Sequence, residues 1–307
     1  MVPPVLESQT ARIPLKASYI HEVVAPGEPF ADLHVHSDCS DGTERPEAVV
    51  ERAASLGFSG LAIADHDTVR GVAPARSRAQ ALGLTLISAV ELSTTAEKGD
   101  LHILGYGVDV EDAGLLDTLS GIETTRRERV SRMLRRLNDL GVKVDLEAFF
   151  ARYPEGSVGR LHVARFLMEA GHVKSRDEAF QRYLGMGRPA YERVNAISPD
   201  EGIRLIRKAG GIPALAHPGR THKDHLISSL TSVGLQAVEV YHSGHPPAAA
   251  RYYRELAARK GLLPVGGSDC HGAGKDQVLM GRVKVPMEYL EVLQRAGARE
   301  EYGRGGS

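Results

Sequence analysis

The sequence predicts an α/β barrel that a helical segment interrupts. From Phe30 onward, short apolar runs alternate with polar clusters and amphipathic helical patterns, which is the rhythm of parallel β/α units. Side chains that can bind metals follow several of these apolar runs directly. Between about residues 108 and 196 the apolar residues recur mostly at helical spacing, and no strand pattern of comparable strength interrupts them.

Seven apolar runs are the predicted strands, at residues 30–36, 60–64, 84–90, 101–106, 211–216, 237–241 and 262–266. Helices are predicted between several of them. Pro46 to Leu56 begins with a proline that suits a first turn, and Asp200 to Lys208 follows a capping box in Ser198-Pro-Asp-Glu201. Strands and helices therefore alternate on both sides of the helical segment.

The length of 307 residues allows the whole barrel to be one domain. The predicted parts are an N-terminal arm at 1–29, the metal-binding barrel at 30–107 and 197–298, a helical insertion domain at 108–196 that contributes to substrate binding, and a flexible Gly-rich tail at 299–307.

Composition and charge are ordinary for a soluble globular protein, with 42% hydrophobic and 25% charged residues. Lys and Arg (38) nearly balance Asp and Glu (39), which excludes a positive field over the whole molecule but not a local one. Two cysteines, Cys39 and Cys270, are too few for a disulfide framework and suit a reducing compartment. No secretory signal pattern and no apolar stretch of about 18 residues is present, so we expect a cytoplasmic protein without a membrane segment.

The stretch Asp32-Leu-His-Val-His36 places two histidines one residue apart on a predicted strand. Side chains alternate between the faces of a strand, so His34 and His36 point to one side while Leu33 and Val35 point to the other. Two imidazoles on one face can bind one cation. A His-x-His pair alone is more often two hydrogen-bonded surface histidines, so further residues are needed to show whether these two bind a metal.

Further metal-binding side chains follow or lie in the other predicted strands. The C-terminal ends of the strands of a β/α barrel converge on one mouth, where active sites are built. Structural histidines have no reason to recur at strand ends, so this distribution predicts a metal centre. The nine candidate ligands are His34, His36, Asp41, His66, Glu91, His102, His217, Asp269 and His271.

Imidazoles mixed with carboxylates suit Mn²⁺, Zn²⁺ or Fe²⁺ better than Ca²⁺ or Mg²⁺, which oxygen ligands alone can bind. Nine candidates exceed the needs of one or two ions, so we expect three divalent transition-metal ions, with Mn²⁺ first among the possible metals. Such a cluster lowers the pKa of a bridging water towards about 7 and neutralises phosphate oxygens. The sequence therefore predicts hydrolysis of phosphate esters by a bridging hydroxide, without a Ser or Cys nucleophile.

Five motifs resemble those of the polymerase and histidinol phosphatase (PHP) family. They extend from about residue 30 to residue 272 and are Asp32-x-His34-x-His36, Ala64-Asp-His-Asp-Thr68, Glu91, His217-Pro218 and Ser268-Asp-Cys-His271. The resemblance implies a distorted seven-stranded (β/α)7 barrel, similar to a TIM barrel, with a trinuclear metal site.

The resemblance also implies how the ligands divide among the ions. The first ion would be bound by His34, His36, Glu91 and Asp269, the second by Glu91, His102 and His217, and the third by Asp41, His66 and His271. Asp41 occupies a position where some family members have histidine, so the third site departs from their pattern.

Two insertion motifs, Val158-Gly-Arg160-Leu-His162 and Tyr183-Leu-Gly-Met-Gly-Arg188-Pro-Ala-Tyr191, are similar to those of one subgroup of the family. Its members remove the 3'-phosphate of nucleoside 3',5'-bisphosphates or cleave short oligonucleotides and RNA ends in the 5'-to-3' direction. The resemblance implies a nucleotide or short RNA substrate, inorganic phosphate as a product and no inferable protein partner. A histidinol-phosphate phosphatase, which the insertion disfavours, and a non-catalytic metal or nucleotide sensor, which the full ligand set disfavours, are the alternatives.

Arginines and polar residues near the strand ends are the candidate substrate contacts. Arg160 follows a Gly-containing turn and can make two parallel hydrogen bonds to a phosphate, although an arginine that caps a helix is the alternative. Asp32 and Asp65 precede ligand histidines, and we expect them to bind the free imidazole nitrogens. The predicted substrate-binding residues are Arg160, Arg220, His242, Ser243 and His245, of which the last three could equally pack behind the ligands. The predicted catalytic residues are Asp32, Asp65, Arg160 and His245.

The longest predicted insertion helix contains a run of six arginines, Arg126, Arg127, Arg129, Arg132, Arg135 and Arg136. Such runs are usually solvated faces, and nearby acidic residues cancel part of the charge. If the run lines a groove towards the metals, it favours an RNA or oligonucleotide substrate, whose binding weakens steeply with salt.

Overall fold

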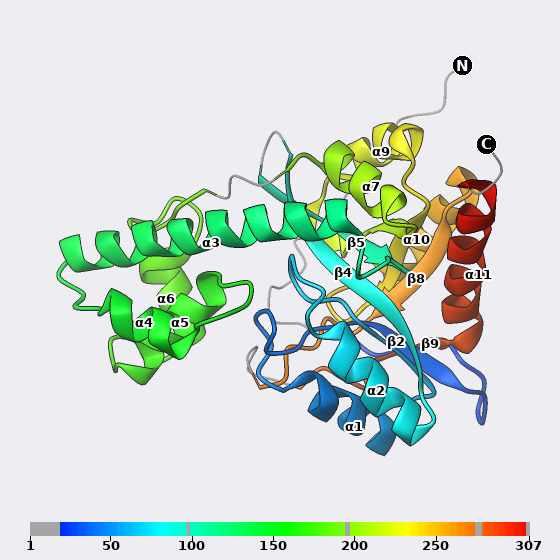
Figure 1. Ribbon diagram of the computed structural model, residues 1–307, viewed down its shortest axis with the longest axis horizontal. Coiled ribbons are helices and arrows are strands. Elements are labelled where there is room, and N and C mark those ends of the chain that lie inside the picture. Colours follow the sequence, from blue (N-terminus) through cyan, green and yellow to red (C-terminus); the bar gives the residue numbers. More distant parts are fainter. Residues whose placement is uncertain (1–18, 97–98, 194–196, 274–277, 305–307) are drawn as a thin grey trace.

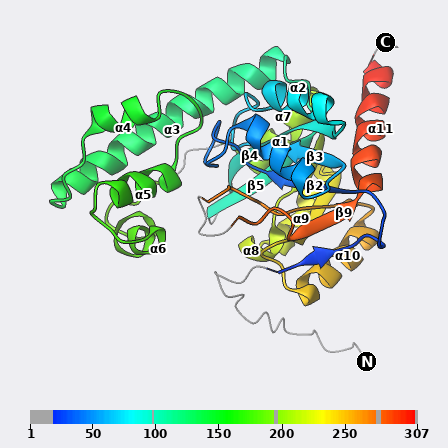
Figure 2. The same cartoon turned by 90° about the horizontal axis from the view of Figure 1, so that it is seen from below.

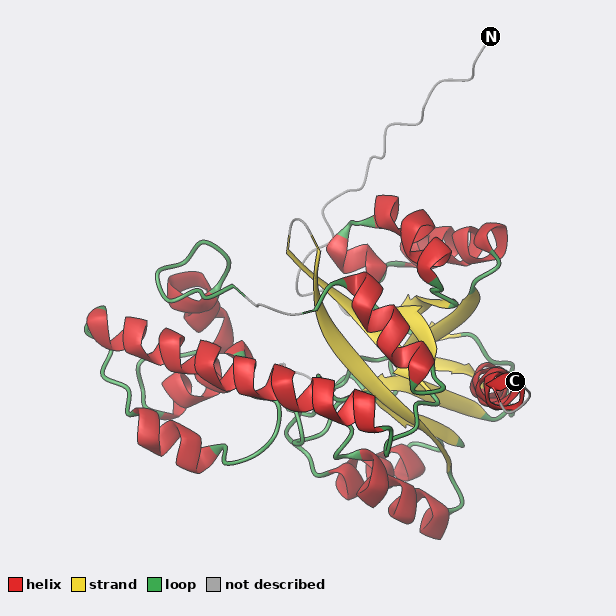
Figure 3. Cartoon of the chain, turned by 45° about the horizontal axis from the view of Figure 1, so that its top comes forward, coloured by secondary structure: helices red, strands yellow, loops and turns green. Residues whose placement is uncertain are grey.

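A strongly curved sheet forms the centre of the protein, with helices over its outer face and a group of helices projecting to one side (Figures 1 and 3). The computed structural model describes residues 19–96, 99–193, 197–273 and 278–304. Parts of the predicted arm (1–18), insertion (194–196) and tail (305–307) lie outside the described residues, as do 97–98 and 274–277.

The strands of the described residues form one nine-stranded sheet, in the order β1-β9-β2-β3-β4-β5-β6-β7-β8. Their bounds are β1 His21–Glu22, β2 Phe30–Val35, β3 Gly60–Ile63, β4 Thr85–Ala96, β5 Gly99–Tyr106, β6 Ile212–Leu215, β7 Ala237–His242, β8 Leu263–Gly267 and β9 Val283–Pro286. The sheet curls so far that Val35, at the end of β2, pairs with Cys270 just beyond β8. The predicted α/β class is confirmed, and β2 to β8 coincide with the seven predicted strands, but β1 and β9 are additional.

Strand β5 runs antiparallel to both of its neighbours, which corrects the prediction of parallel β/α units throughout. In the long β4–β5 hairpin, Ser93 is paired with His102. Paired residues share a face of the sheet, and Glu91 lies two residues before Ser93, so Glu91 and His102 project to the same side. The reversal therefore brings the beginning of β5, and not its end, to the rim where the other candidate ligands lie.

Six helices of at least seven residues pack around the sheet, at α1 Pro46–Ser55, α2 Val72–Leu82, α7 Pro199–Lys208, α9 Ile227–Val233, α10 Pro247–Lys260 and α11 Met287–Arg304. The predicted capping box of α7 is confirmed, because Ser198 accepts from the backbone N–H of Glu201 and the Glu201 carboxylate accepts from that of Ser198. Helix α11 extends to Arg304, so the predicted flexible tail is helical over residues 299–304. No helix among the described residues is long and apolar enough to cross a membrane.

The projecting helices are α3 Ala113–Asp139, α4 Leu146–Arg152, α5 Arg160–Glu169, α6 Arg176–Ala179 and the π-helix η1 Phe180–Leu184. Helix α3 belongs to two hydrophobic clusters. Leu115 and Leu119 pack with the apolar residues of the sheet, whereas Val130 and Met133 pack with those of α4, α5 and η1. One continuous helix thus connects both clusters. The predicted domain boundaries stay a prediction.

Candidate metal centre

Glu91, on β4, lies at the centre of a group of imidazoles. Its Oε2 atom is 3.2 Å from a ring nitrogen of each of three histidines, His34, His36 and His66. The Nε2 atoms of His34 and His36 are themselves 3.1 Å apart, as the alternation of side chains along β2 predicts. Both rings and the carboxylate are almost completely buried.

The other oxygen of Glu91 contacts two further histidines. Oε1 lies 2.8 Å from Nδ1 of His102 and 2.9 Å from Nε2 of His217. His102 reaches this point because β5 is antiparallel, and His217 because it lies two residues after the end of β6. Burial lowers the pKa of His217 to about 4, so its ring is neutral at pH 7 and has a lone pair available for a metal.

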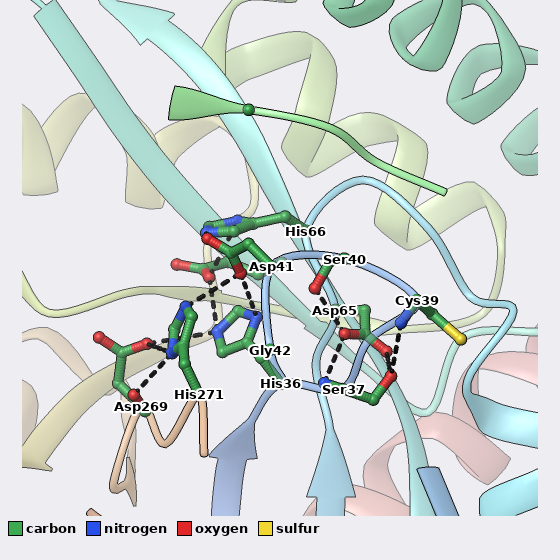
Figure 4. Close-up of polar contacts among 12 residues, drawn as sticks. His36, Ser37, Cys39, Ser40, Asp41, Gly42, Asp65, His66, Asp269 and His271 are labelled. Atoms are coloured by element: carbon green, nitrogen blue, oxygen red, sulfur yellow. Dashed lines mark hydrogen bonds and ion pairs between the residues drawn. The ribbon is translucent and has the colours of Figure 1, made fainter. Parts of the chain in front are cut away.

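The loops after β2 and β8 complete the cluster (Figure 4). His271 Nε2 lies 3.0 Å from Asp41 Oδ1, and Asp269 Oδ1 lies 3.3 Å from His36 Nε2. Asp41, His66, His36 and His271 point towards one another in Figure 4. All nine candidate ligands therefore lie at one rim, although they are up to 237 positions apart in the sequence.

Three groups of ligand atoms lie close enough to hold cations. They are His36, Asp41, His66 and His271; His34, His36 and Asp269; and His66, Glu91 and His102. These groups resemble the predicted division but share members, since His36 and His66 each belong to two groups. His217 belongs to none of these three groups, but it contacts Glu91 and its ring stacks on that of His34 at 5.9 Å.

Several atoms of the cluster have the character of unused metal ligands. Glu91 Oε2 and the Nδ1 atoms of His36 and His66 are buried and have no hydrogen-bond partner among the described residues. The Nδ1 atom of His34 hydrogen-bonds a carboxylate of Glu239, which places the hydrogen on Nδ1 and leaves the Nε2 lone pair facing the cluster. Buried lone pairs that face one another repel unless a cation lies between them, so the donor set fits divalent metals.

Two candidate ligands have strained backbone conformations. The φ angles of His217 and Asp269 are 29° and 55°, in the left-handed region that few residues other than glycine adopt, although Asp and His adopt it more often than most. Such strain costs on the order of 1–3 kcal/mol per residue and concentrates at functional sites.

Glu239, on β7, is a residue of the site that the sequence analysis missed. Its Oε1 lies 2.9 Å from His34 Nδ1, and its Oε2 accepts the backbone N–H of His217 at 2.7 Å. Burial raises the pKa of Glu239, but the electrostatic effects of His34 and His242 and the hydrogen bond with His34 together outweigh burial and lower the pKa to about 2. This carboxylate orients the ligands in the way predicted for Asp32 and Asp65.

Asp32 and Asp65 do not bind imidazoles, which corrects that prediction. Asp32 Oδ1 accepts the backbone N–H of Ser268 at 2.8 Å. Asp65 accepts from the backbone and hydroxyl of Ser37 and from the hydroxyl of Ser40, apart from the ligands (Figure 4). Both carboxylates instead fix the loops that follow the strands.

His245 and Ser243 are also occupied by structural contacts. The Nδ1 of His245 donates to the carbonyl of Val240, and its Nε2 accepts the backbone N–H of Gly219, so neither nitrogen is available for a substrate. The hydroxyl of Ser243 donates to the carbonyl of Ser268. These contacts favour the alternative of a packing role behind the ligands for both residues over the predicted catalytic and substrate-binding roles.

His242 and Arg220 lie at the rim. His242 Nδ1 accepts the backbone N–H of Gly244, which leaves the ring hydrogen on Nε2, 3.4 Å from Asp269 Oδ2. Arg220 is exposed, with its side chain beside Gly244. His242 is therefore a hydrogen-bond donor that faces a candidate ligand.

The insertion contacts the barrel beside the candidate ligands. Arg126, on α3, donates to Asp67 Oδ2 at 2.7 Å, one residue after His66. Arg165, on α5, donates to the backbone carbonyls of Asp41 and Gly42. Part of the arginine run is thus buried at the rim instead of forming a solvated face.

Arg129 and Arg160 lie next to each other, further from the ligands. Arg160 Nη2 is 3.5 Å from Asp100 Oδ2, two residues from His102, and its guanidinium lies over the rings of Phe180 and Tyr191. Arg129 is 4% exposed, and its Nη2 has no partner among the described residues. Burial, together with the charge of Arg160, lowers the pKa of Arg129 to about 10. It remains charged at pH 7, without a carboxylate partner in the described structure.

The PHP domain family matches residues 32–183, a segment that includes Glu91 and five of the other candidate ligands. A 3',5'-nucleoside bisphosphate phosphatase from Chromobacterium violaceum is 34% identical over 251 residues, which are 80% of this chain and 88% of that protein. The chain belongs to the PHP domain family. The family consists of metal-dependent phosphoesterases, so the predicted enzyme class is confirmed.

Two further comparisons agree with this assignment. The 5'-3' exoribonuclease Rnm of Escherichia coli is 33% identical over 247 residues, which are 78% of this chain and 84% of the relative. A crystal structure from Bifidobacterium adolescentis, of a protein assigned as a metal-dependent phosphoesterase, superposes with a TM-score of 0.82 at 30% identity. The match covers 89% of this chain and 98% of that one.

Proposed function

We propose that this PHP enzyme hydrolyses phosphate esters of nucleotides. The substrates are the 3'-phosphate of nucleoside 3',5'-bisphosphates and the 5' ends of short oligonucleotides and RNA, with inorganic phosphate or mononucleotides as products. The observation that supports this proposal best is the contact of the helical insertion with the barrel beside the candidate ligands. Arg126 of the insertion donates to Asp67, next to His66, and Arg165 donates to the backbone carbonyl of Asp41. Arg160, further from the ligands, pairs with Asp100, two residues before His102.

Three divalent ions are proposed for the cluster, with Mn²⁺ as the first choice and Zn²⁺ or Fe²⁺ as alternatives. The nine proposed ligands are His34, His36, Asp41, His66, Glu91, His102, His217, Asp269 and His271. Mixed imidazole and carboxylate donors support this choice of metals. When bound, such ions supply a water molecule of lowered pKa and neutralise the charge on phosphate oxygens.

Glu239 and His242 are the proposed auxiliary residues of the reaction. Glu239 keeps His34 in the tautomer whose Nε2 lone pair faces the ligands. His242 presents its Nε2–H beside Asp269, where it can donate a hydrogen bond to that carboxylate or to a phosphate oxygen of the substrate. These roles replace those that the sequence suggested for Asp32, Asp65 and His245.

The insertion is the proposed binding site for the rest of the nucleotide. Arg160 is partly exposed and needs only to leave Asp100, at 3.5 Å, to form two hydrogen bonds with a phosphate. The positive charge of Arg129, whose Nη2 has no hydrogen-bond partner among the described residues, strengthens the attraction for an anion, because buried charges are poorly screened. Exposed Arg220 is a proposed further contact.

The metal-dependent reaction is tested with the purified protein in Mn²⁺. Nucleoside 3',5'-bisphosphates, 5'-phosphorylated short oligoribonucleotides and histidinol phosphate are compared, and released phosphate and mononucleotides are measured. We expect turnover of the nucleotides. A preference for histidinol phosphate, or binding of nucleotides without turnover, would support the alternative functions instead.

Metal analysis and two substitutions test the centre itself. We expect three equivalents of metal per chain, and Asp269→Asn should lose both metal and turnover while the fold, followed by circular dichroism, is kept. Asp139→Asn, at the exposed end of α3, is the control with the same chemical change. A chain that binds no metal, or an active Asp269→Asn variant, would contradict the proposed centre. We also place the enzyme in the cytoplasm, which the two free cysteines support.

A further inference from the structure

Residues 19–23 of the N-terminal segment bind the turn that follows β7. The backbone N–H of Tyr19 donates to the carbonyl of Ser243 at 2.6 Å, and Nε2 of His21 donates to the carbonyl of His245 at 2.9 Å. His21 is 7% exposed and more than 200 positions from this turn in the sequence. In Figure 2 the short blue strand β1, which contains His21, lies beside β9.

The turn determines how His242 faces the metal centre. Its middle residue, Gly244, donates its backbone N–H to His242 Nδ1 at 2.8 Å, which assigns the ring hydrogen to Nε2. That hydrogen faces Asp269 Oδ2 at 3.4 Å. The turn is also held to the segment before Asp269, because the Ser243 hydroxyl donates to Ser268 at 2.7 Å. Movement of the turn therefore changes both the orientation of His242 and its tautomer.

We propose that His21 is a positioning residue of the active site, which fixes the turn at residues 243–245 and through it the Nε2–H of His242 towards Asp269. This role rests on the proposed function, in which His242 assists the reaction. Two backbone hydrogen bonds hold the strand in place, from the N–H of His21 to the carbonyl of Arg282, just before β9, and from the N–H of Val23 to that of Lys284 on β9. The strand thus presents the imidazole of His21 from a fixed position.

The chemistry of His21 suits this role. Burial lowers its pKa, so the ring is neutral and has a single N–H, which the carbonyl of His245 assigns to Nε2. A buried carbonyl without its donor is unfavourable, and a small shift of the turn that exposes this carbonyl to another donor relieves the cost. Loss of the His21 hydrogen bond is therefore expected to displace Gly244 from His242.

Two substitutions separate this hydrogen bond from packing. His21→Phe keeps a buried ring but removes the donor, whereas His21→Gln supplies an amide N–H at a similar distance from the backbone. Glu22→Ala is the control on the same strand, since the exposed side chain of Glu22 forms an ion pair with Lys284, away from the turn. All three variants alter one of the two residues of β1, so their effects can be compared directly.

The first measurement needs no activity. The ¹⁵N shifts of the His242 ring, assigned with a His242→Gln variant, report its tautomer in the metal-free protein. We expect hydrogen on Nε2 in the wild type, in Glu22→Ala and in His21→Gln, and a mixture of tautomers in His21→Phe. An unchanged His242 tautomer in His21→Phe would overturn the proposal.

The second measurement is steady-state hydrolysis with the metal-loaded enzyme. We expect His21→Phe to lower kcat about tenfold with KM almost unchanged, because small misplacements of reacting groups affect the rate more than binding. His21→Gln should restore most of the rate. Equal rates in Phe and Gln variants would overturn the proposal, whereas a wild type without phosphoesterase activity would contradict the proposed function and leave the tautomer result valid.

Discussion

Glu239 and His34 form a completely buried pair, with 2.9 Å between Oε1 and Nδ1. The carboxylate orients the imidazole and makes its Nε2 a better metal ligand. We expect Glu239→Gln to weaken metal binding about 10- to 100-fold, because the amide is a poorer acceptor and cannot serve both His34 and the backbone N–H of His217. Metal titration followed by elemental analysis measures this loss. Glu255→Gln, on the exposed side of α10, is the matched control, and equal affinities in the two variants would remove Glu239 from the site.

Gly267, at the end of β8, is packed against the backbone of His34. A Cβ at this position would overlap the Cβ and backbone nitrogen of His34. We expect Gly267→Ala to lower the free energy of unfolding by about 1–3 kcal/mol or more, and to displace His34. Gly121→Ala is the control, because a Cβ there meets no atom within 4 Å and stabilises a helix by about 0.5–1 kcal/mol. Thermal unfolding distinguishes the two, and a stable Gly267→Ala variant that binds metal normally would disprove the close packing.

Arg160 is expected to affect substrate binding more than the chemical step, since it touches no candidate ligand. We expect Arg160→Met to raise KM for a nucleoside 3',5'-bisphosphate about tenfold or more, the effect of losing hydrogen bonds to a charged group, with little change in kcat. Arg135→Met removes the same charge from an exposed position of α3 and should change KM little. If both substitutions raise KM equally, the effect comes from the general field of the insertion and not from a contact.

His162 is expected to make the insertion sensitive to acid. Burial lowers the pKa of its ring to about 4 from the ordinary 6.5, and Nδ1 accepts the backbone N–H of Gly159. The unfolded chain therefore binds a proton below pH 6.5 that the folded chain binds only near pH 4, and stability is lost as the pH falls through this range. The difference corresponds to about 3 kcal/mol. His162→Asn keeps an acceptor but does not titrate, so its stability, measured in urea at pH 7 and pH 4, should fall less than that of the wild type; equal losses would contradict this origin.

The strands and the ligand cluster follow from local patterns in the sequence. The alternation of His34, on β2, with His36, one residue beyond the end of β2, and the polar residues at the ends of buried runs are sufficient to bring the candidates to one rim. The direction of β5 does not follow from such alternation, which is the same in parallel and antiparallel strands. The length of the connection does indicate an antiparallel β5, because the ten residues between 90 and 101 are fewer than a parallel crossover needs.

Other parts of the site depend on pairings that appear only in three dimensions. Glu239 lies between two valines in a buried strand, and a carboxylate there must have a partner, but the sequence does not reveal that the partner is His34. Arg126 and Arg129 follow Ile122 and precede Met133 at helical spacing, which places both on the buried face of α3. The sequence analysis did not predict their burial, because arginine is rarely buried without a specific contact.

Helix α3 has 27 residues and joins the two hydrophobic clusters without a break. A residue added between Leu119 and Arg126 would turn everything beyond it by about 100° around the helix axis and advance it by about 1.5 Å. The arginines would then rotate away from Asp67 and the ligand rim while each cluster stayed intact. In homologous enzymes, insertions or deletions in the part of α3 between the two clusters should therefore add or remove whole helical turns. Only such changes return the guanidinium groups to the side of the helix that faces the ligand rim.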